Sequence, residues 1–385
     1  MKVLHVYRTY FPDSQGGLEE VIRQICLSTR AGAVESRVFT LSRRPHPATL
    51  DCAEGQIVRV KQNFEIASCG FTFGGISEFR RQAAWADVIH YHFPWPWADA
   101  LHALAGYPGP AIVTYHSDIV RQKLLSHLYR PLMNRFLGSM ARIVATSPNY
   151  FATSDVLSRF SDKVEVVPIG IDADQRHPFA EDDPFVQHVA DRFGRGFFLF
   201  VGVLRYYKGL HILLNAMRDA AYKVVIVGSG PVEQELRRQA EQLRLDNVIF
   251  GGYVADDVKM ALFQLCRAVV FPSYLRAEAF GVTLLEGAMC AKPLISAEVG
   301  SGTSHINIDR KTGLVVTPGC SRSLRDAMDF LYGHPEQAAQ MGLQARARYE
   351  ELFTGATMGD RYCRIYQAVV MESDVRARVT LRSAD

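Results

Sequence analysis

The feature that most constrains the fold is an alternation, along the whole chain, of short apolar runs with longer amphipathic segments. This order is typical of βα units, in which successive strands build parallel sheets covered by helices. The strands predicted in the first half are residues 2–8, 35–42, 56–61, 86–92, 111–116, 142–147 and 163–169. Those predicted in the second half are 197–203, 223–229, 247–253, 268–273, 292–296 and 312–316. The pattern predicts an α/β protein with two doubly wound, Rossmann-like sheets.

The composition of one segment indicates a connector between two domains. The chain has 385 residues, enough for two domains with a core each. Residues 170–196 are rich in charge, proline and glycine, which is typical of a linking segment. We expect an N-terminal domain at 1–180 and a C-terminal domain at 181–354, with a helix at about 355–375 packing back on the first.

Charge and cysteine content exclude several classes of protein. The formal net charge of +3 is too small to indicate nucleic-acid binding, so no such partner is expected. The seven cysteines lie far apart without a C-x-x-C pair, so neither a zinc site nor a disulfide framework is indicated. Arg8 and Pro12 interrupt the apolar run that a signal peptide would need, and no later stretch is long and apolar enough to cross a membrane. These observations predict a cytoplasmic protein, with attachment to a membrane surface left open.

A glycine pair follows the first predicted strand. Gly16 and Gly17 open a helix whose first amides lack partners within the helix and whose dipole is positive at that end. Such a helix start suits a phosphate, so both residues are candidates for the nucleotide site. The alternative is a tight strand-to-helix turn that needs glycine for its backbone.

Two cations follow the first strand of the second half. That strand, FFLFVGV, ends at Val203, and the next residues, LRYYKG, contain Arg205 and Lys208. Two cations three residues apart, where a loop becomes a helix, could hold a diphosphate, the arginine through its forked donors and the lysine as a point charge. Gly202 and Gly228, the latter in the turn GSGP after the next strand, are candidates for the same nucleotide site. Solvated surface charge is the alternative for the two cations.

Two carboxylates lie eight residues apart in AEAFGVTLLEGAM. Glu278 falls in the loop after the strand 268–273, beside the backbone amides of Phe280, Gly281 and Val282. Glu286 follows about two helical turns later and could accept two hydrogen bonds from a vicinal diol such as a ribose. The alternative is that both acids stabilise one helix N-terminus through its dipole.

The motifs of both halves together resemble a known family. The glycine pair, YHSD at 115–118, RYYKG, GSGP, FGGYV and the E-x7-E block stand in the order typical of the retaining GT-B glycosyltransferases of family 4. The resemblance runs from Met1 to about residue 370. The segments RAEAFGVTLLEGAM and GSGTSHINIDRKTGLVV look most like bacterial mannosyltransferases and D-rhamnosyltransferases of lipopolysaccharide O-polysaccharide assembly. Many relatives have a third glutamate where this chain has GSGTSHIN, which leaves the role of His305 open.

The resemblance implies a fold, substrates and a reaction. It implies two Rossmann-like domains facing across a cleft, and a GDP-mannose or GDP-D-rhamnose donor with no permanently bound cofactor. The acceptor would be a polyprenyl-diphosphate-linked glycan. In a retaining member without an evident nucleophile, the acceptor hydroxyl attacks from the side that the nucleotide leaves, and a diphosphate oxygen takes the proton. Positioning and charge stabilisation would then supply most of the rate.

For the nucleotide, the resemblance assigns roles to five residues. Arg205 and Lys208 would bind the diphosphate and stabilise charge on the leaving group. Glu286 would hold the ribose. The backbone around Tyr253 and Val254 would contact the base.

For the sugar, the resemblance implies contacts from both halves. Glu278 and the amides of residues 280–282 would meet the donor sugar. His116, at the end of the strand 111–116, would contact the sugar and help to orient the acceptor. A plain core histidine is the alternative for His116.

Other functions remain open from the sequence alone. Asp172 and Asp174 form a D-x-D pattern that could hold a metal, but Arg205 and Lys208 already supply positive charge, so no metal is expected. A UDP-sugar donor is an alternative, as is a GT-B protein that binds or epimerises a nucleotide sugar. A dinucleotide-dependent oxidoreductase is disfavoured because no G-x-G-x-x-G follows the first strand.

A basic and apolar segment suggests contact with the inner face of the cytoplasmic membrane. No acidic residue lies between Asp118 and Asp155. Basic and apolar residues alternate across 121–142, as in segments that lie on an anionic bilayer. They are Arg121, Lys123, Arg130, Arg135 and Arg142 with Leu124, Leu125, Leu128, Tyr129, Leu132, Met133 and Phe136. Several of the apolar side chains are also candidates for the core.

Overall fold

The chain folds into two compact units. A computed structural model describes residues 1–385 except 67–68, 120–122, 173–178, 181 and 383–385. The first unit comprises Met1–Gly170 and Gly355–Asp385, and the second comprises Ile171–Thr354. The division thus falls after Gly170 rather than after residue 180. The reason is that Ile171 already pairs with the second unit, its amide donating to the carbonyl of Phe353 at 3.0 Å.

The first unit is built on an eight-stranded sheet of order β10-β9-β8-β7-β1-β2-β4-β3 and a separate β5-β6 hairpin. Its strands are β1 (Lys2–Val6), β2 (Glu35–Ser42), β3 (Thr49–Cys52), β4 (Gly55–Lys61), β5 (Phe64–Ile66), β6 (Cys69–Phe71), β7 (Val88–Phe93), β8 (Ala111–Tyr115), β9 (Arg142–Ala145) and β10 (Val164–Val166). Its helices are α1 (Gly17–Thr29), η1 (Arg30–Gly32), α2 (Gly75–Trp85), α3 (Pro96–Ala105), α4 (Lys123–Ser139), α5 (Pro148–Thr153), η2 (Leu157–Lys163) and α14 (Gly355–Arg382).

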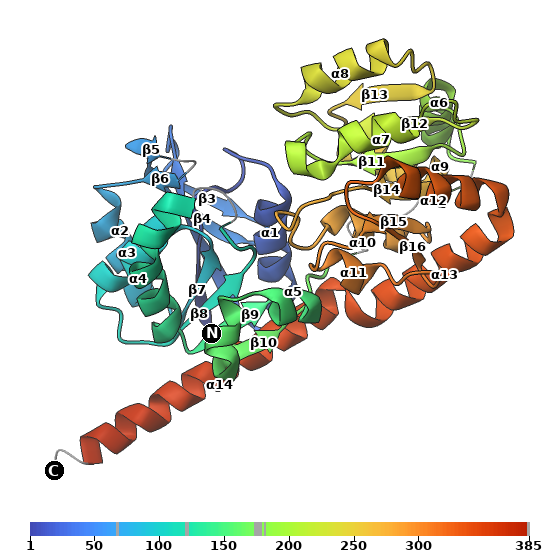
Figure 1. The fold of residues 1–385 in the computed structure, drawn as a ribbon. Coiled ribbons are helices and arrows are strands. Elements are labelled where there is room, and N and C mark those ends of the chain that lie inside the picture. Colours follow the sequence, from blue (N-terminus) through green and yellow to red (C-terminus); the bar gives the residue numbers. More distant parts are fainter. Residues whose placement is uncertain (67–68, 120–122, 173–178, 181, 383–385) are drawn as a thin grey trace. The chain divides into compact units, whose positions relative to one another are not determined.

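The second unit contains a six-stranded parallel sheet of order β13-β12-β11-β14-β15-β16. Its strands are β11 (Phe198–Val201), β12 (Val224–Val227), β13 (Val248–Gly252), β14 (Ala268–Phe271), β15 (Leu294–Ala297) and β16 (Gly313–Val316). Its helices are α6 (Pro184–Phe193), η3 (Tyr206–Lys208), α7 (Leu210–Ala216), α8 (Glu233–Gln242), α9 (Asp256–Leu265), α10 (Val282–Met289), α11 (Thr303–Ile306), α12 (Ser321–Gly333) and α13 (Pro335–Leu352). Figure 1 shows β13 at one edge of this sheet and β16 at the other.

Every strand predicted from the apolar runs is present, and three short strands were not predicted. The central strands are buried on both faces, which produces the continuous apolar runs that the sequence displays. By contrast, β3, β5 and β6 are three or four residues long, and the side chains of β5 are all exposed. Strands this short carry little apolar periodicity, so the pattern does not reveal them.

The long C-terminal helix belongs to the first unit. α14, the red helix of Figure 1, packs against α1. It also reaches the sheet, because the hydroxyl of Tyr362 lies 2.8 Å from Oγ1 of Thr114 and that of Tyr366 lies 2.8 Å from Nδ1 of His90. In the part of the chain that the structure describes, no helix is long and apolar enough to cross a membrane.

In each sheet the order of the strands reverses next to one central strand. In the first unit β1 lies between β2 and β7, and in the second unit β11 lies between β12 and β14. β1 and β7 are parallel neighbours, as are β11 and β14, so the carboxyl ends of each pair lie side by side at one edge of the sheet, and the strand order runs away from them in opposite directions. Open α/β sheets bind their ligands at such topological switch points. Functional side chains are thus expected after these four strands.

Candidate functional site

A buried ion pair lies at the switch point of the second unit. Nζ of Lys208, after β11, lies 2.5 Å from Oε2 of Glu278, after β14. Ser273 donates a second hydrogen bond to the same carboxylate oxygen at 3.1 Å. The ammonium also lies 4.5 Å from the ring centroid of Phe271, a cation–π distance. The predicted diphosphate lysine and the predicted sugar glutamate are therefore in direct contact.

Close packing of two loops brings these residues together. Gly209 ends the short helix η3 with a φ of 72°, and an added Cβ there would lie 2.1 Å from the carbonyl oxygen of Pro272. Only glycine combines that backbone conformation with that approach. The amide of Tyr274 also donates to the carbonyl of Tyr207 at 3.1 Å. The loops after β11 and β14 thus touch through their backbones and place Lys208 beside Glu278.

Arg205 lies at the start of η3 and is exposed. Its charge acts on Tyr207, whose pKa burial raises to about 12, with Glu278 adding to the rise and Arg205 opposing it. Arg205 therefore supplies an accessible positive charge close to the buried pair. This position fits a contact with a phosphate that arrives from solvent.

The second glutamate has a lysine partner of its own. Glu286, buried on α10, lies 3.0 Å from Nζ of Lys259 on α9. The same ammonium lies 2.8 Å from Asp256, three residues earlier. The sequence reasoning missed Lys259, although its place on the helix after the strand 247–253 and its spacing from Asp256 were visible. The two glutamates therefore belong to different charge networks and do not share the capping of one helix.

The start of α10 offers backbone rather than side chains. The ring of Phe280 is buried and packs edge-on against Phe353, with 6.2 Å between ring centroids. Gly281 has a φ of 95° and precedes α10, and Thr283 donates to the carbonyl of Val201 at 3.1 Å. Contact of a ligand with the amides of residues 280–282 stays a prediction.

The remaining predicted nucleotide residues have different surroundings. An added Cβ at Gly228, whose φ is 124°, would lie 2.0 Å from the carbonyl oxygen of Gly202. Glycine at position 228 therefore allows the loops after β11 and β12 to pack closely against each other. Tyr253 is 74% exposed directly after β13, with Val254 half-buried beside it. Their contact with a base stays a prediction.

The glycine pair of the first unit begins α1. Gly16 is the extended residue before the helix and Gly17 is its first residue. Glu19, in the first turn, is buried, and its carboxylate would lie 2.6 Å from a Cβ added at Gly16. Ser14 donates to that carboxylate at 2.7 Å. A carboxylate of the chain thus already lies at this helix start, and phosphate binding there stays a prediction.

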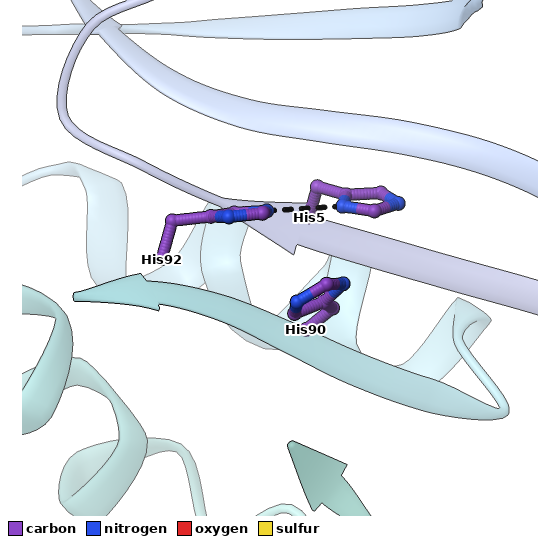
Figure 2. Close-up of side chains that lie close together, drawn as sticks. All are labelled: His5, His90 and His92. Carbon is purple, nitrogen blue, oxygen red and sulfur yellow. Dashed lines mark hydrogen bonds between the residues drawn. The ribbon is translucent and has the colours of Figure 1, made fainter. Parts of the chain in front are cut away.

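Four buried histidines lie at the switch point of the first unit, and the sequence reasoning had named only His116. Nε2 of His116 lies 3.0 Å from Nδ1 of His92, and Nε2 of His92 lies 3.1 Å from Nδ1 of His5. The ring of His90 packs against that of His92 in a tilted arrangement, with 4.4 Å between centroids. Figure 2 shows His5 on β1 and His90 and His92 on β7. The H-x-H of VIHYHF was a visible signal, because alternate strand residues share a face.

Burial keeps these imidazoles neutral. It lowers the pKa of His5 and of His116 to about 3. The pKa values of His90 and His92 are also well below the ordinary value, through burial first and repulsion among the histidines second. Nitrogens of His5, His90 and His92 lie within 4.8 Å of one another, a grouping that a metal could use. Both ring nitrogens of His90, however, already form hydrogen bonds, to Thr114 and Tyr366.

Two features outside these sites had been singled out. His305, whose role the sequence left open, lies edge-on to Phe353 with 5.4 Å between centroids. Of the D-x-D pattern, Asp174 lies outside the described residues, and Asp172 lies at the start of the second unit. In the described part of the chain, the three histidines are the only group of possible metal ligands.

The basic and apolar segment divides between core and surface. Met133 and Phe136 on α4 are buried, whereas Leu128 is 81% exposed, and Arg130 and Arg135 are exposed as well. The side chains of 120–127, including Arg121, Lys123, Leu124 and Leu125, lie outside the described residues.

Arg142 does not contribute a free charge to that surface. It is paired with Glu372 at 2.5 Å and with Glu165 at 2.9 Å. The expected basic face therefore reduces, among the described side chains, to the exposed residues of α4.

Both halves of the chain match family models. Residues 187–348 match the model for glycosyl transferases group 1, and residues 15–175 match that for glycosyltransferase family 4. The chain is 51% identical to the D-rhamnosyltransferase WbpZ of Pseudomonas aeruginosa over 92% of either chain. It is 46% identical to the O-antigen chain mannosyltransferase C of Escherichia coli, over 96% of this chain and 99% of that one.

Solved structures with the same fold are more distant in sequence. A sucrose-phosphate synthase from Thermosynechococcus elongatus has a TM-score of 0.80 at 19% identity, covering 96% of this chain and 99% of that one. HepE of Anabaena in complex with UDP has a TM-score of 0.79 at 19% identity, covering 96% and 100%. These similarities confirm the predicted GT-B fold. Matched by both models and by close full-length relatives, the chain belongs to the family 4 glycosyltransferases and is a hexosyltransferase.

Proposed function

We propose that the protein is a retaining transferase that moves a D-mannosyl or D-rhamnosyl residue, in α linkage, from a GDP-sugar to a lipid-linked glycan during O-antigen assembly. The names of the two relatives at 51% and 46% identity support the sugar and the pathway. The observation that carries the site assignment is the contact between Lys208 and Glu278 at the switch point of the second unit. It joins a cation suited to a diphosphate with a carboxylate suited to a sugar.

The charges of this pair suggest how a donor binds. Both side chains are largely buried, at 13% and 10% exposed, so each depends on the other for compensation. A diphosphate brings negative charge that competes with Glu278 for the ammonium, with Arg205 as a second cation. Glu278 is then released to accept hydrogen bonds from sugar hydroxyls. The two cations stabilise the charge that grows on the leaving diphosphate.

The rest of the nucleotide is assigned to neighbouring loops of the same unit. Glu286 accepts hydrogen bonds from the ribose hydroxyls through its carboxylate. The backbone at Tyr253 and Val254 meets the base, and the exposure of Tyr253 supports this. The loops at Gly202 and Gly228 border the diphosphate.

The reaction proposed for this site needs neither a metal nor a covalent intermediate. The acceptor hydroxyl attacks from the face that the diphosphate leaves, and a diphosphate oxygen takes its proton, so configuration is retained. His116 contacts the sugar. The glycine pair Gly16 and Gly17 stays a weaker candidate for the phosphates, because Glu19 lies beside it.

The acceptor is proposed to be a glycan on a polyprenyl diphosphate. Such a substrate lies at the inner face of the cytoplasmic membrane, and the protein would act there as a peripheral enzyme. The exposed residues Leu128, Arg130 and Arg135 of α4 support this location.

One set of assays tests the proposal. Calorimetry compares GDP with UDP, and turnover is measured with GDP-mannose and GDP-D-rhamnose on a lipid-linked acceptor, with and without EDTA. We expect GDP to bind more tightly and activity to persist in EDTA. NMR of the product gives the anomeric configuration. Tighter binding of UDP would overturn the GDP-sugar donor, and an inverted product would overturn retention. Loss of activity in EDTA that Mn²⁺ restores would overturn independence of a metal.

The rival is a protein that epimerises a nucleotide sugar. Incubation with GDP-mannose in the absence of acceptor separates the two. A transferase leaves the sugar unchanged apart from slow hydrolysis, whereas an epimerase forms an isomer.

A further inference from the structure

Three imidazoles form a hydrogen-bonded chain in the first unit. The chain runs from His5 on β1 through His92 on β7 to His116 after β8. His5 and His92 are almost fully buried, at 0% and 1% exposed, whereas His116 is 6% exposed. Nδ1 of His5 and Nε2 of His116 face His92, so each of its two nitrogens has one imidazole partner. The chain therefore has a fully buried end at His5 and a slightly exposed end at His116.

Proton counting gives the chain a direction. Each neutral imidazole carries one N–H, and each link needs one donor, so all three rings must donate in the same direction. Nε2 of His5 is buried and has no hydrogen-bond partner among the described residues. If the chain donated from His116 toward His5, that atom would carry an orphaned N–H in the core.

The opposite direction avoids this cost. His5 then donates from Nδ1 to His92, and His92 donates from Nδ1 to Nε2 of His116. Only a lone pair is left at Nε2 of His5. Orphaned buried N–H groups are rarer than buried acceptors without a partner, so this direction is favoured. His116 must then carry its own proton on Nδ1.

We propose that His92, held by His5, is a positioning residue that fixes His116 in the Nδ1–H tautomer, so that His116 offers an N–H donor to the substrate sugar. The inference rests on the proposed contact of His116 with the sugar. The inference specifies which ring nitrogen of His116 carries the proton at that contact. It also names the side chains that determine this tautomer.

The surroundings hold the middle ring in place. The ring of His90 packs against that of His92 at an interplanar angle of 30°, and the two nitrogens of His90 are bonded to Thr114 at 2.7 Å and Tyr366 at 2.8 Å. The His92 ring is thus bonded at both nitrogens and packed on one face. Burial also lowers the pKa of all four histidines, so the chain stays neutral and each ring keeps a single proton.

A matched pair of substitutions separates positioning from plain structure. In His92→Asn the side-chain amide nitrogen can stand near the position of Nδ1 and still donate to His116. In His92→Gln the amide group reaches the position of Nε2, toward His5, and the donor to His116 is lost. Both replacements are polar and of similar size, so a structural role would make them equivalent.

NMR of histidine labelled with ¹⁵N reads the tautomer directly, in the whole protein and without substrate. We expect His116 to be the Nδ1–H tautomer in the wild type and in His92→Asn, and a mixture of tautomers in His92→Gln. We expect kcat/KM to fall about tenfold or more in His92→Gln and less in His92→Asn, with GDP affinity unchanged in both, since one hydrogen bond to a sheltered group contributes about 1.4 kcal/mol or more.

Several results would overturn the proposal. An Nε2–H tautomer of His116 in the wild type would reverse the chain, and this measurement stands even if a variant fails to fold. Equal tautomers and equal kcat/KM in the two variants would leave His92 a structural residue. One equivalent of zinc in the purified protein, lost in both His92 variants, would replace the hydrogen-bonded chain by a metal site. The tautomer needs no donor sugar, so a wrong donor assignment would appear only in the turnover assays.

Discussion

The two sheets carry opposite chemistry at the same topological point. In the second unit, the strands β11 and β14 deliver a lysine and a glutamate that form a buried ion pair. In the first unit, β1 and β7 deliver histidines that burial keeps neutral and that bond to one another. The difference teaches that a doubly wound sheet fixes where a site lies, whereas the side chains after its strands fix what the site can hold.

The contrast also suggests a division of tasks. A charged pair responds strongly to the charge of a diphosphate, because the interaction is electrostatic and sheltered from water. A neutral hydrogen-bonded chain offers direction and little charge, which suits a sugar hydroxyl. Substitutions in the two units should therefore fail in different ways.

The largest effect is expected from the ion pair. Lys208→Ala removes the cation that we propose for the leaving diphosphate and leaves Glu278 buried without this partner, so we expect kcat to fall at least about 100-fold and GDP affinity to drop. Arg205→Ala should have a smaller effect on GDP affinity because Arg205 is exposed. Steady-state kinetics and GDP titration measure both.

Arg310→Ala is the matched control, since Arg310 is 79% exposed and pairs only loosely with Asp309 at 3.9 Å. It should behave as the wild type. Near-normal turnover of both Lys208→Ala and Arg205→Ala would place the phosphate elsewhere.

The two glutamates should separate binding from chemistry. Glu278→Gln should bind GDP nearly as well as the wild type but turn over far more slowly, because we propose that its carboxylate acts beside the sugar as charge develops. Glu286→Gln should chiefly weaken GDP binding, since a ribose contact is the same in ground and transition states. Equilibrium titration with GDP and single-turnover kinetics distinguish the two. Equal losses of GDP affinity with unchanged chemistry would contradict the division.

The sequence reveals the second unit's site more fully than the first's. Lys208 and Glu278 were predicted because charged residues directly after apolar strands stand out against their surroundings. The contact between Lys208 and Glu278 was not predicted, because it depends on the close packing of Gly209 against Pro272 between two loops. Lys259 was missed because a lysine on an amphipathic helix is ordinarily a solvated residue.

Most histidines of the first unit's cluster were not predicted from the sequence. Apart from His116, its histidines lie inside apolar runs, where each reads as an isolated core residue. Only the register that pairs His5 with His90 and His92 with Thr114 puts them on one face. Strand order and register come from the whole sheet, and no local pattern specifies them.

The neutral histidines predict an acid-sensitive first unit. The folded pKa of His5 and of His116 is about 3 against the ordinary 6.5, so the unfolded chain binds more protons between these values. Stability is therefore greatest above about pH 6.5 and falls as pH decreases toward 3. At pH 5.5 each of the two groups lowers the free energy of unfolding by roughly 1 kcal/mol, and His90 and His92 act in the same direction.

Hydrogen exchange compares the units within one molecule. Between pH 7.5 and 5.5, after correction for the intrinsic exchange rate, peptides from β1, β7 and β8 should lose more protection than those from β11 and β14. An equal change in both sets would show that the histidines do not limit the stability of the first unit.

The smallest effect expected concerns the exposed surface of α4 in the first unit. Arg130 and Arg135 are exposed on α4 near the exposed Leu128, and an accessible arginine contributes about 1 kcal/mol to binding at an anionic bilayer. Arg130→Gln and Arg135→Gln should each lower the affinity for vesicles of anionic lipid about fivefold, as measured by co-sedimentation, with no effect on GDP affinity. Arg310→Gln, an exposed charge of the second unit, is the control and should bind vesicles as the wild type does. If the three variants lost affinity equally, the attraction would come from the total charge of the protein and α4 would have no special part in it.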